Sequence, residues 1–231
     1  MMLRLQIISV KKKTLYFLQN SLNGLSSWTV DWGVNFNCIK CGVMHLGKNN
    51  PKYSYTLNGT VLNETTSEKD LGVFIDPLLN FEDHINITVK KARKMSGLVT
   101  RTITYKSKEI MLPLFKSLIR PILEYGNAIW SPFLKKKIDF VESVQRSFTK
   151  CIIGLNKLEY NQRLKVLGLP SLEFRRLRGD LIETYKICNK IYDPATTLTL
   201  FDFDPLNKTR SNGFKITKRV TNHNQYHNCF Y

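Results

Sequence analysis

Three side chains that can bind zinc lie close together in the sequence. Cys38 and Cys41 are separated by two residues, and His45 follows four residues after Cys41. A structural zinc site needs a fourth ligand, and the next histidine along the chain is His84. The residues therefore favour two reduced thiols in or beside a strand over a metal site.

A near-match to a phosphate-binding loop overlaps this segment. GVMHLGKN, from Gly42 to Asn49, follows the pattern G-x-x-x-x-G-K-[ST] up to its last position. Asn49 has no hydroxyl group to bind magnesium, and Pro51 disfavours the helix whose N-terminus would hold the phosphate groups. We therefore expect no nucleotide site here.

Two further pairs of titratable residues occur near the C-terminus. Asp202 and Asp204 would lie on one side of an extended segment and could share a cation, but Pro205 and polar neighbours favour a loop. His223 and His227 have helical spacing in a segment with no helical pattern, so we expect both at the surface. The motifs G-x-S-x-G, H-E-x-x-H and G-x-G-x-x-G do not occur. The residues alone therefore assemble no catalytic centre.

The composition is that of a strongly basic chain with a folded core. The 231 residues include 35 Lys and Arg against 18 Asp and Glu, a formal net charge of +17 at pH 7, and 42% are hydrophobic. That apolar fraction is too high for a disordered chain. The basic residues are densest between Lys90 and Lys150, with clusters at 90–94 and 135–137. This charge indicates a polyanionic partner.

Nothing in the sequence indicates export or a membrane. No apolar run reaches the roughly 18 residues of a membrane span. The N-terminal apolar run is broken by Arg4 and Gln6, and the basic cluster at 11–13 follows it, unlike in a secretory signal. Five irregularly spaced cysteines indicate reduced thiols. We therefore expect an intracellular protein, nuclear or cytoplasmic, that is not secreted and contacts no membrane; its oligomeric state is not indicated.

Before residue 80 the hydrophobic pattern predicts one helix and a small group of strands. Apolar residues spaced three and four apart predict a helix over 15–32. The other elements expected here are strands at 34–36, 43–46 and 71–75, and a hairpin in which the alternating segment 53–57 leads through a turn at Asn58-Gly59 to a return strand at 60–62.

After residue 80 the pattern becomes helical. An apolar stripe from Phe81 to Ile103 predicts a long helix with lysine and arginine on its opposite face. A second helical segment is expected over 107–130, where Pro113 and Pro121 should kink or divide it. Further helices are expected over 134–153, 161–167 and 172–192. Ser171 should cap the last helix, whose apolar side is formed by Phe174, Leu177, Leu181, Tyr185 and Cys188. The fold class expected is α+β.

Several segments point to a known family by their sequence and their order. They are KCGVMHLG (40–47), EKDLGVFID (68–76), FKSLIRPILEYG (115–126), ESVQR (142–146) and LEFRRLRGDL (172–181). This succession resembles the C-terminal palm and thumb of the reverse transcriptase (RNA-directed DNA polymerase) of LINE-type, jockey-like non-LTR retrotransposons, which are transposable elements. The resemblance covers residues 15–220.

The resemblance implies roles for three groups of residues. Lys40 falls at the lysine of the family's fourth polymerase motif, which protonates the departing pyrophosphate; the residues by themselves favour a solvated lysine beside a turn. Leu71 and Gly72 fall on the primer-grip hairpin, which holds the 3′ end of the growing strand. The basic helices correspond to the thumb, which follows the template–primer duplex along its backbone. The nucleic-acid-binding residues expected on them are Lys90, Lys91, Arg93, Lys94, Arg101, Lys116 and Arg120.

The resemblance also predicts domains. A small β-rich remnant of the polymerase palm is followed by a mostly α-helical thumb and connector. The expected ranges are 1–77 for the end of the palm, 78–155 for the thumb, 156–192 for the helical connector and 193–231 for an irregular tail. Without the rest of the palm sheet, apolar side chains of the first range should be exposed. Those expected to be exposed are Leu22, Trp28, Phe36 and Phe74.

The departures from the family limit the activity expected. Polymerisation uses two metal ions held by paired carboxylates, and the chain has no Asp-Asp pair to match the family's aromatic-x-Asp-Asp turn. We expect a partial reverse transcriptase, truncated at both ends and inactive alone, with no cofactor of its own, that binds template RNA or an RNA–DNA hybrid. The intact family enzyme needs magnesium. Two alternatives stay open: a host-adopted module that binds nucleic acid or protein without catalysis, and a basic helical scaffold for acidic proteins.

Overall fold

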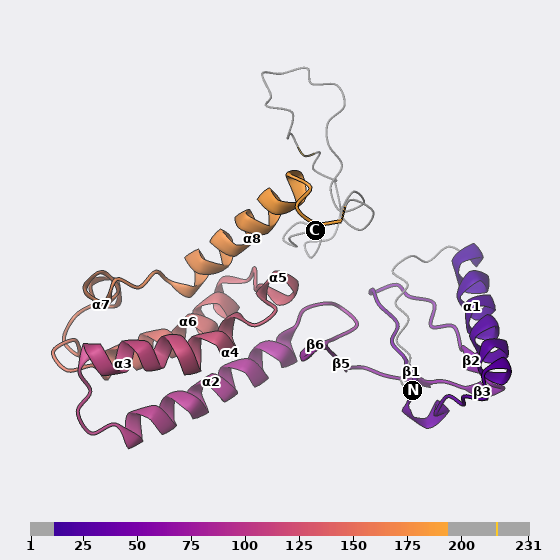
Figure 1. Ribbon diagram of the computed structural model, residues 1–231, viewed down its shortest axis with the longest axis horizontal. Helices are drawn as coiled ribbons and strands as arrows, with labels where there is room; N and C mark the ends of the chain where they lie inside the picture. The colour runs from indigo at the N-terminus through magenta and orange to yellow at the C-terminus, as the bar shows by residue number, and fades with distance from the viewer. Residues whose placement is uncertain (1–11, 194–215, 217–231) are drawn as a thin grey trace, which may run out of the picture. The chain divides into compact units, whose positions relative to one another are not determined.

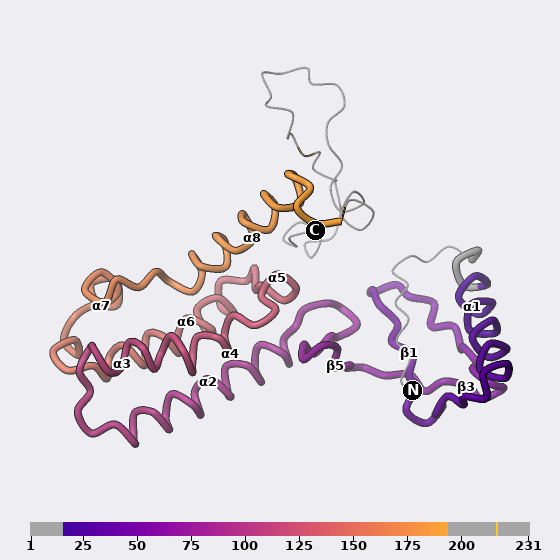
Figure 2. The backbone as a smooth tube through the Cα atoms, in the orientation of Figure 1, coloured from indigo at the N-terminus to yellow at the C-terminus, as the bar shows by residue number. Residues whose placement is uncertain are grey.

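The chain folds into two compact units. The computed structural model describes residues 12–193 and residue 216, and the boundary between the units lies between Asp83 and His84. Within the described residues, the first unit holds one long helix and all the short strands, whereas the second is helical (Figure 1). Figure 2 traces the backbone through both units. The α+β fold class predicted from the sequence is confirmed.

The first unit is a helix followed by three two-stranded sheets. Strand β1 pairs with β4 in parallel, while β2–β3 and β5–β6 are antiparallel pairs. The elements are α1 (Lys12–Asp31), the 3₁₀ helix η1 (Cys38–Lys40), β1 (Gly42–Val43), β2 (Thr56–Leu57), β3 (Thr60–Val61), β4 (Asn63–Glu64), β5 (Glu68–Asp70) and β6 (Val73–Ile75). The predicted helix and the return strand at 60–61 are present, whereas no strand forms at 34–36.

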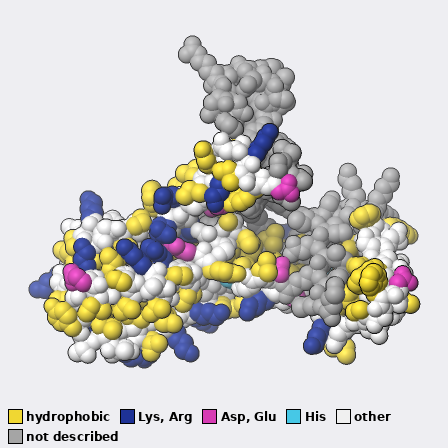
Figure 3. Space-filling view, viewed as in Figure 1, with side chains coloured by type: hydrophobic (Ala, Val, Ile, Leu, Met, Phe, Trp, Pro, Cys, Tyr) yellow, Lys and Arg dark blue, Asp and Glu magenta, His cyan; other side chains and the backbone are white. Residues whose placement is uncertain are grey.

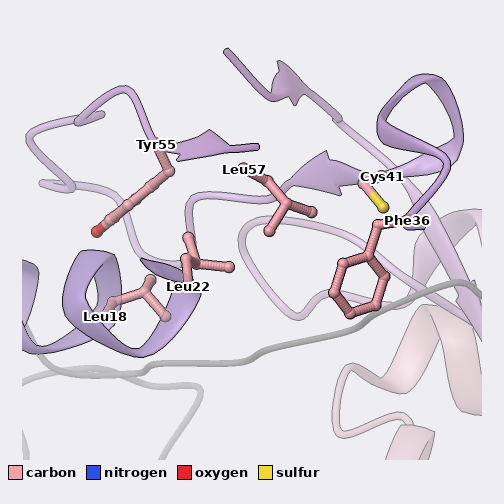
Figure 4. Close-up of a cluster of buried hydrophobic side chains, with 6 residues drawn as sticks. All are labelled: Leu18, Leu22, Phe36, Cys41, Tyr55 and Leu57. Atoms are coloured by element: carbon pink, nitrogen blue, oxygen red, sulfur yellow. The ribbon is translucent and has the colours of Figure 1, made fainter. Parts of the chain in front are cut away.

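The first unit has its own small hydrophobic core. Leu18 and Leu22 of α1 pack with four buried side chains from the loops and strands (Figure 4): Phe36, Cys41, Tyr55 and Leu57. Gln19 of α1 ties the helix to β2, because its amide both donates to the Thr56 carbonyl and accepts from the Thr56 N–H, at 2.9 and 3.0 Å.

This core corrects the exposure expected from the sequence. Leu22 and Phe36 are buried rather than exposed, and Phe74 is half-buried, because the unit closes on itself. Trp28 is exposed as expected and lies beside Trp32, with ring centroids 6.0 Å apart.

Two turns in this unit use left-handed backbone conformations. Asn58 and Gly59, with φ of +51° and +74°, join β2 to β3 as predicted. Leu71 and Gly72, with φ of +44° and +89°, form the equivalent turn between β5 and β6. The strand predicted over 71–75 therefore begins only at Val73, because its first two residues make the turn.

The second unit is built from helices. They are α2 (Glu82–Thr102), which begins at the unit boundary, α3 (Lys108–Leu114), the π-helix η2 (Phe115–Ile119), α4 (Arg120–Glu124), α5 (Asn127–Trp130), α6 (Lys135–Lys150), α7 (Tyr160–Leu167) and α8 (Leu172–Cys188). In the core, the ring centroids of Phe115 and Phe148 lie 5.2 Å apart. Trp130, the last residue of α5, is also buried. The predicted helices are confirmed, with α6 and α8 ending three or four residues earlier than expected.

The second helical segment contains a π-helical turn between its two prolines. Pro113 lies inside α3. Before Pro121 the helix widens into the π-turn of η2, where the N–H of Arg120 bonds the carbonyl of Phe115 five residues back. A proline ring clashes with the carbonyl four residues before it, and one wide turn moves that carbonyl aside.

Polar side chains fix the position of α8. Ser171 caps it as predicted, accepting from the N–H of Phe174 at 3.1 Å. The buried carboxylate of Glu142, from α6, accepts from the N–H of Leu172 at 2.9 Å and from the hydroxyl of Tyr160. The pKa of Tyr160 is raised, mainly because the side chain is buried and also because its hydroxyl donates to Glu142. The first N–H groups of a helix have no acceptor within the helix, and the Glu142 carboxylate accepts from the first of them in α8. This bond anchors the first turn of α8 to α6.

Candidate nucleic-acid interface

Helix α2 turns its apolar side inward and its basic side to solvent. Its buried side includes Val89 and Ala92, both with no exposed surface. Lys90, Lys94 and Arg101 are four and seven residues apart and so lie on one face of the helix. At 1.5 Å per residue the three span roughly 17 Å. We call these three side chains the cation row.

The cation row has no partner within the described part of the chain. Among residues 12–193, neither its three side chains nor Lys91, which lies beside it, has a hydrogen bond or an ion pair. A Cβ placed on Gly97 would lie 4.0 Å from a guanidinium nitrogen of Arg101, so this side chain lies back over the glycine, along the helix. The row therefore presents three unneutralised charges to an external anion.

Arg93 plays a different part from its neighbours. Its guanidinium donates to the hydroxyl of Ser143 at 2.9 Å and lies 5.0 Å from the ring centroid of Phe140. Both partners belong to α6, so Arg93 ties α2 to α6. The sequence grouped it with Lys94 because the two are adjacent and equally basic.

The other two predicted cations lie on separate helical segments. Lys116 is exposed on η2. Arg120 is half-buried, with its Nε 3.9 Å from the carboxylate of Glu124. Glu124 also holds Arg175 of α8 in a bidentate pair, with one nitrogen at 2.9 Å. Arg120 thus shares the carboxylate of Glu124 with Arg175, and that one carboxylate can neutralise only one of the two positive charges.

Several exposed cations outside the predicted set also lack partners among the described residues. Figure 3 shows lysine and arginine side chains spread over the helical unit, with few acidic side chains between them. These additional residues are Lys136, Lys150, Lys157, Lys165 and Arg178. Nothing in their local sequence separates them from paired lysines such as Lys135, which contacts Asp139 and Glu173.

The two positions assigned to polymerase motifs lie in the first unit. Lys40 is the last residue of η1 and its side chain is exposed, while its N–H bonds the side chain of Asn37 at 3.3 Å. Leu71 is 82% exposed at the tip of the β5–β6 hairpin, next to Gly72. A leucine held in the left-handed region and turned to solvent is unusual.

The candidate zinc ligands of this unit do not converge. Cys41 is buried in the small core, Cys38 lies 3.5 Å from the carbonyl of Leu57, and His45 stacks on Tyr55. Within residues 12–193, no three His, Cys, Asp or Glu side chains are grouped so that they could hold a metal ion. The pairs Asp202/Asp204 and His223/His227 lie outside the described residues.

The sequence is weakly similar to a retrotransposon polymerase. Over 141 residues it is 24% identical to the RNA-directed DNA polymerase from mobile element jockey of Drosophila funebris, an alignment that covers 59% of this chain and 15% of that protein. Over 119 residues it is 23% identical to an uncharacterized protein of Caenorhabditis elegans, covering 50% of this chain and 60% of the relative. The matched segment thus spans less than two thirds of either relative.

No protein-family model matches the sequence, and no solved structure matches it significantly. The chain is therefore distantly related to a retrotransposon reverse transcriptase over part of its length. Among the described helices, none has both the length and the apolar character needed to cross a bilayer.

Proposed function

We propose that this chain is part of a reverse transcriptase of a jockey-like non-LTR retrotransposon and binds template–primer nucleic acid through the helical unit without polymerising DNA by itself. The cation row of α2 is the observation that carries this proposal. Lys90, Lys94 and Arg101 are exposed and aligned, and none of them pairs with a carboxylate of residues 12–193. Phosphate binding releases condensed counterions from the nucleic acid, so each free cation adds to affinity.

The proposal that polymerisation is absent rests on the sequence. Two-metal catalysis needs paired carboxylates, and the chain contains no Asp-Asp pair. By resemblance, Lys40 would act on the leaving pyrophosphate and the Leu71–Gly72 turn would contact the primer end in a longer protein that supplies those carboxylates. Magnesium would belong to that longer enzyme.

Binding is tested with the full chain and a labelled RNA–DNA hybrid across a salt series. The variant Lys90→Gln/Lys94→Gln/Arg101→Gln should weaken binding roughly 100-fold at low salt and reduce the slope of log K against log salt by roughly 3. A matched control, Lys150→Gln/Lys157→Gln/Lys165→Gln, removes the same charge elsewhere and should change both quantities much less.

Two results would contradict the proposal. Equal losses in the two triple variants would show that total charge, rather than the cation row, determines binding. Preferential competition by an acidic protein over the hybrid would favour a scaffold for acidic proteins. Separately, template-primed DNA synthesis by the purified chain with magnesium would disprove the absence of polymerisation while leaving the binding result intact.

A further inference from the structure

Three segments that are far apart in the sequence meet at one end of the helical unit. The N–H of Ile153, just after α6, donates to the carbonyl of Lys106, just before α3, at 3.0 Å. The ammonium group of Lys108, the first residue of α3, donates to the carbonyl of Val166 in α7 at 2.7 Å. Figure 1 shows the end of α2, the start of α3 and α7 at this end of the unit. The two bonds hold the three segments together.

Lysine side chains from all three segments gather here. We call Lys106, Lys150, Lys157 and Lys165 the end cluster. The last three are exposed and Lys106 is half-buried. Within residues 12–193, none of the four side chains has a hydrogen bond or an ion pair. On the face seen in Figure 3, lysine and arginine side chains occupy this end of the unit. The end cluster therefore presents further positive charge to an external anion.

The carboxylates of the same segments are used in starting helices. Glu159 caps α7, because its side chain accepts from the backbone N–H of Gln162. Glu109 lies in the first turn of α3, where hydrogen bonds to its own backbone and to Ser107 lower its pKa. Neither carboxylate is ion-paired to the end cluster among the residues that the structure describes. The end cluster thus keeps its charge.

An exposed aromatic ring lies beside these cations. Tyr105, in the turn between α2 and α3, directly precedes Lys106. Its side chain is 68% exposed and contacts no other ring within the described part of the chain. Surfaces that bind single-stranded nucleic acid combine cations for the phosphates with aromatic rings on which unpaired bases stack. The charges alone would also suit an acidic protein, but the free ring among them favours nucleotides.

The end cluster lies beyond the last member of the cation row. The row follows α2 toward its C-terminal end, and Arg101 comes four residues before Tyr105. Helix α2 ends at Thr102, so the turn with Tyr105 begins directly after the row. A nucleic acid bound along α2 can therefore continue onto this end of the unit.

We propose that Tyr105 and the end cluster bind a single-stranded stretch of nucleic acid that continues from the duplex held by the cation row. One base stacks on the ring of Tyr105, and neighbouring phosphates contact the lysines. This inference rests on the proposed binding of nucleic acid by the helical unit. It adds a second surface, which selects single strands over duplex because only unpaired bases offer a free face for stacking.

Binding of two probes by the full chain tests the role of the ring. The probes are a labelled single-stranded RNA of roughly ten nucleotides and a blunt RNA–DNA hybrid. Tyr105→Ala should weaken binding of the single strand roughly tenfold and leave binding of the hybrid unchanged. Tyr105→Phe keeps the ring and should bind both probes as the wild type does. The control Tyr185→Ala removes a ring of α8 that is 64% exposed and should affect neither probe.

The charges of the end cluster are tested with the same probes across a salt series. Lys150→Gln/Lys157→Gln/Lys165→Gln should reduce the slope of log K against log salt by roughly 2 for the single strand. Its binding of the blunt hybrid should change little, which also shows that the variant is folded.

Three outcomes would overturn this inference. The first is an affinity for the single strand that does not depend on Tyr105, in a chain that still binds the hybrid. The second is an equal loss on both probes in Tyr105→Ala. The third is displacement of the single strand by polyglutamate with equal efficiency in wild type and Tyr105→Ala, which would assign the surface to an acidic protein. A wild-type chain that binds neither probe would contradict the proposed function as well.

Discussion

Helices α2 and α8 are both amphipathic, yet only α2 turns its whole apolar stripe toward the core. Helix α2 buries Val89 and Ala92 and presents its cations to solvent. Helix α8 buries Arg176 together with Leu172 and Ile187, and it exposes an apolar row formed by Phe174, Leu177, Leu181 and Tyr185. The first arrangement is driven by apolar burial. The second is set by hydrogen bonds and ion pairs at one end of the helix. Spacing in a sequence therefore identifies the faces of a helix without saying which face is inside.

The buried polar side of α8 carries an electrostatic cost that its anchors offset. Burial lowers the pKa of Arg176 and raises the pKa of Asp180, since both charged forms lose water. Each charge partly restores the other, and the Glu142 carboxylate also favours the charged form of Arg176. Removing Glu142 or Asp180 would leave the buried charge of Arg176 less well compensated and so destabilise this packing of α8.

The largest expected effect is the difference between one apolar-to-glutamate change on each helix. Val89→Glu buries an unpaired carboxylate in the core of the second unit and should lower the free energy of unfolding by roughly 4 kcal/mol. Leu181→Glu adds the same group to an exposed position and should cost about 1 kcal/mol at most. Urea denaturation of both variants measures the difference; similar losses would mean that the two helices do not differ in which face is buried.

The second effect concerns the anchor of α8. Glu142→Ala leaves the hydroxyl of Tyr160 and the N–H of Leu172 without their acceptor. We expect a loss of about 3 kcal/mol in the free energy of unfolding. The control is Asp139→Ala in the same helix, which removes only ion pairs of 3.8 and 3.9 Å and should cost less than about 1 kcal/mol. Equal costs would show that α8 is held by something other than its first turn.

Much of the local structure could be predicted because it depends on local signals. The stripe of α2, the Asn58-Gly59 turn and the Ser171 cap each involve residues close in sequence, and all three are present. The hydrophobic pattern placed Leu71 in a strand because leucine is not a residue that favours positive φ, and only the family resemblance put Leu71 and Gly72 on a hairpin. The sequence did not show which side of α8 faces the core. That side is set by contacts of Leu172 with Glu142 and of Arg175 with Glu124, which are 30 and 51 residues apart in the sequence.

In the candidate nucleic-acid interface, too, the sequence identified the basic face of a helix but not the contacts of each residue on it. Sequence reasoning selected the basic face of α2 correctly as a row of exposed charges. It could not separate Arg93 from Lys94, because only the fold places Phe140 and Ser143 beside one and solvent beside the other.

The third prediction uses that pair. Arg93→Ala should lower the free energy of unfolding by about 1 kcal/mol through the lost contacts to α6. Lys94→Ala should leave stability unchanged but weaken hybrid binding roughly fivefold and reduce the salt slope by about 1. The two assays on both variants form a crossed test. An equal effect of both substitutions on binding would place Arg93 in the interface as well.

The smallest expected effect is a pH dependence of stability caused by His84 of α2. His84 is buried against the edge of Trp130, with ring centroids 5.1 Å apart. Burial lowers the pKa of His84, and the positive charge of Lys91 lowers it further. In the unfolded chain histidine has a pKa of about 6.5, so on acidification the unfolded state takes up the proton first. Stability is therefore highest above about pH 6.5 and falls as the pH drops toward the folded-state pKa.

Melting temperatures at about pH 8 and about pH 5.5 measure this loss. His84→Gln should reduce the difference between the two pH values. Lys91→Gln should reduce it less, because that substitution removes only the smaller of the two causes. Carboxylates whose pKa is lowered, such as Glu64 and Glu183, titrate at lower pH and so do not account for a change in this window. If the melting temperatures of wild type and His84→Gln depended on pH in the same way, His84 would not be the group whose protonation destabilises the folded chain in this window.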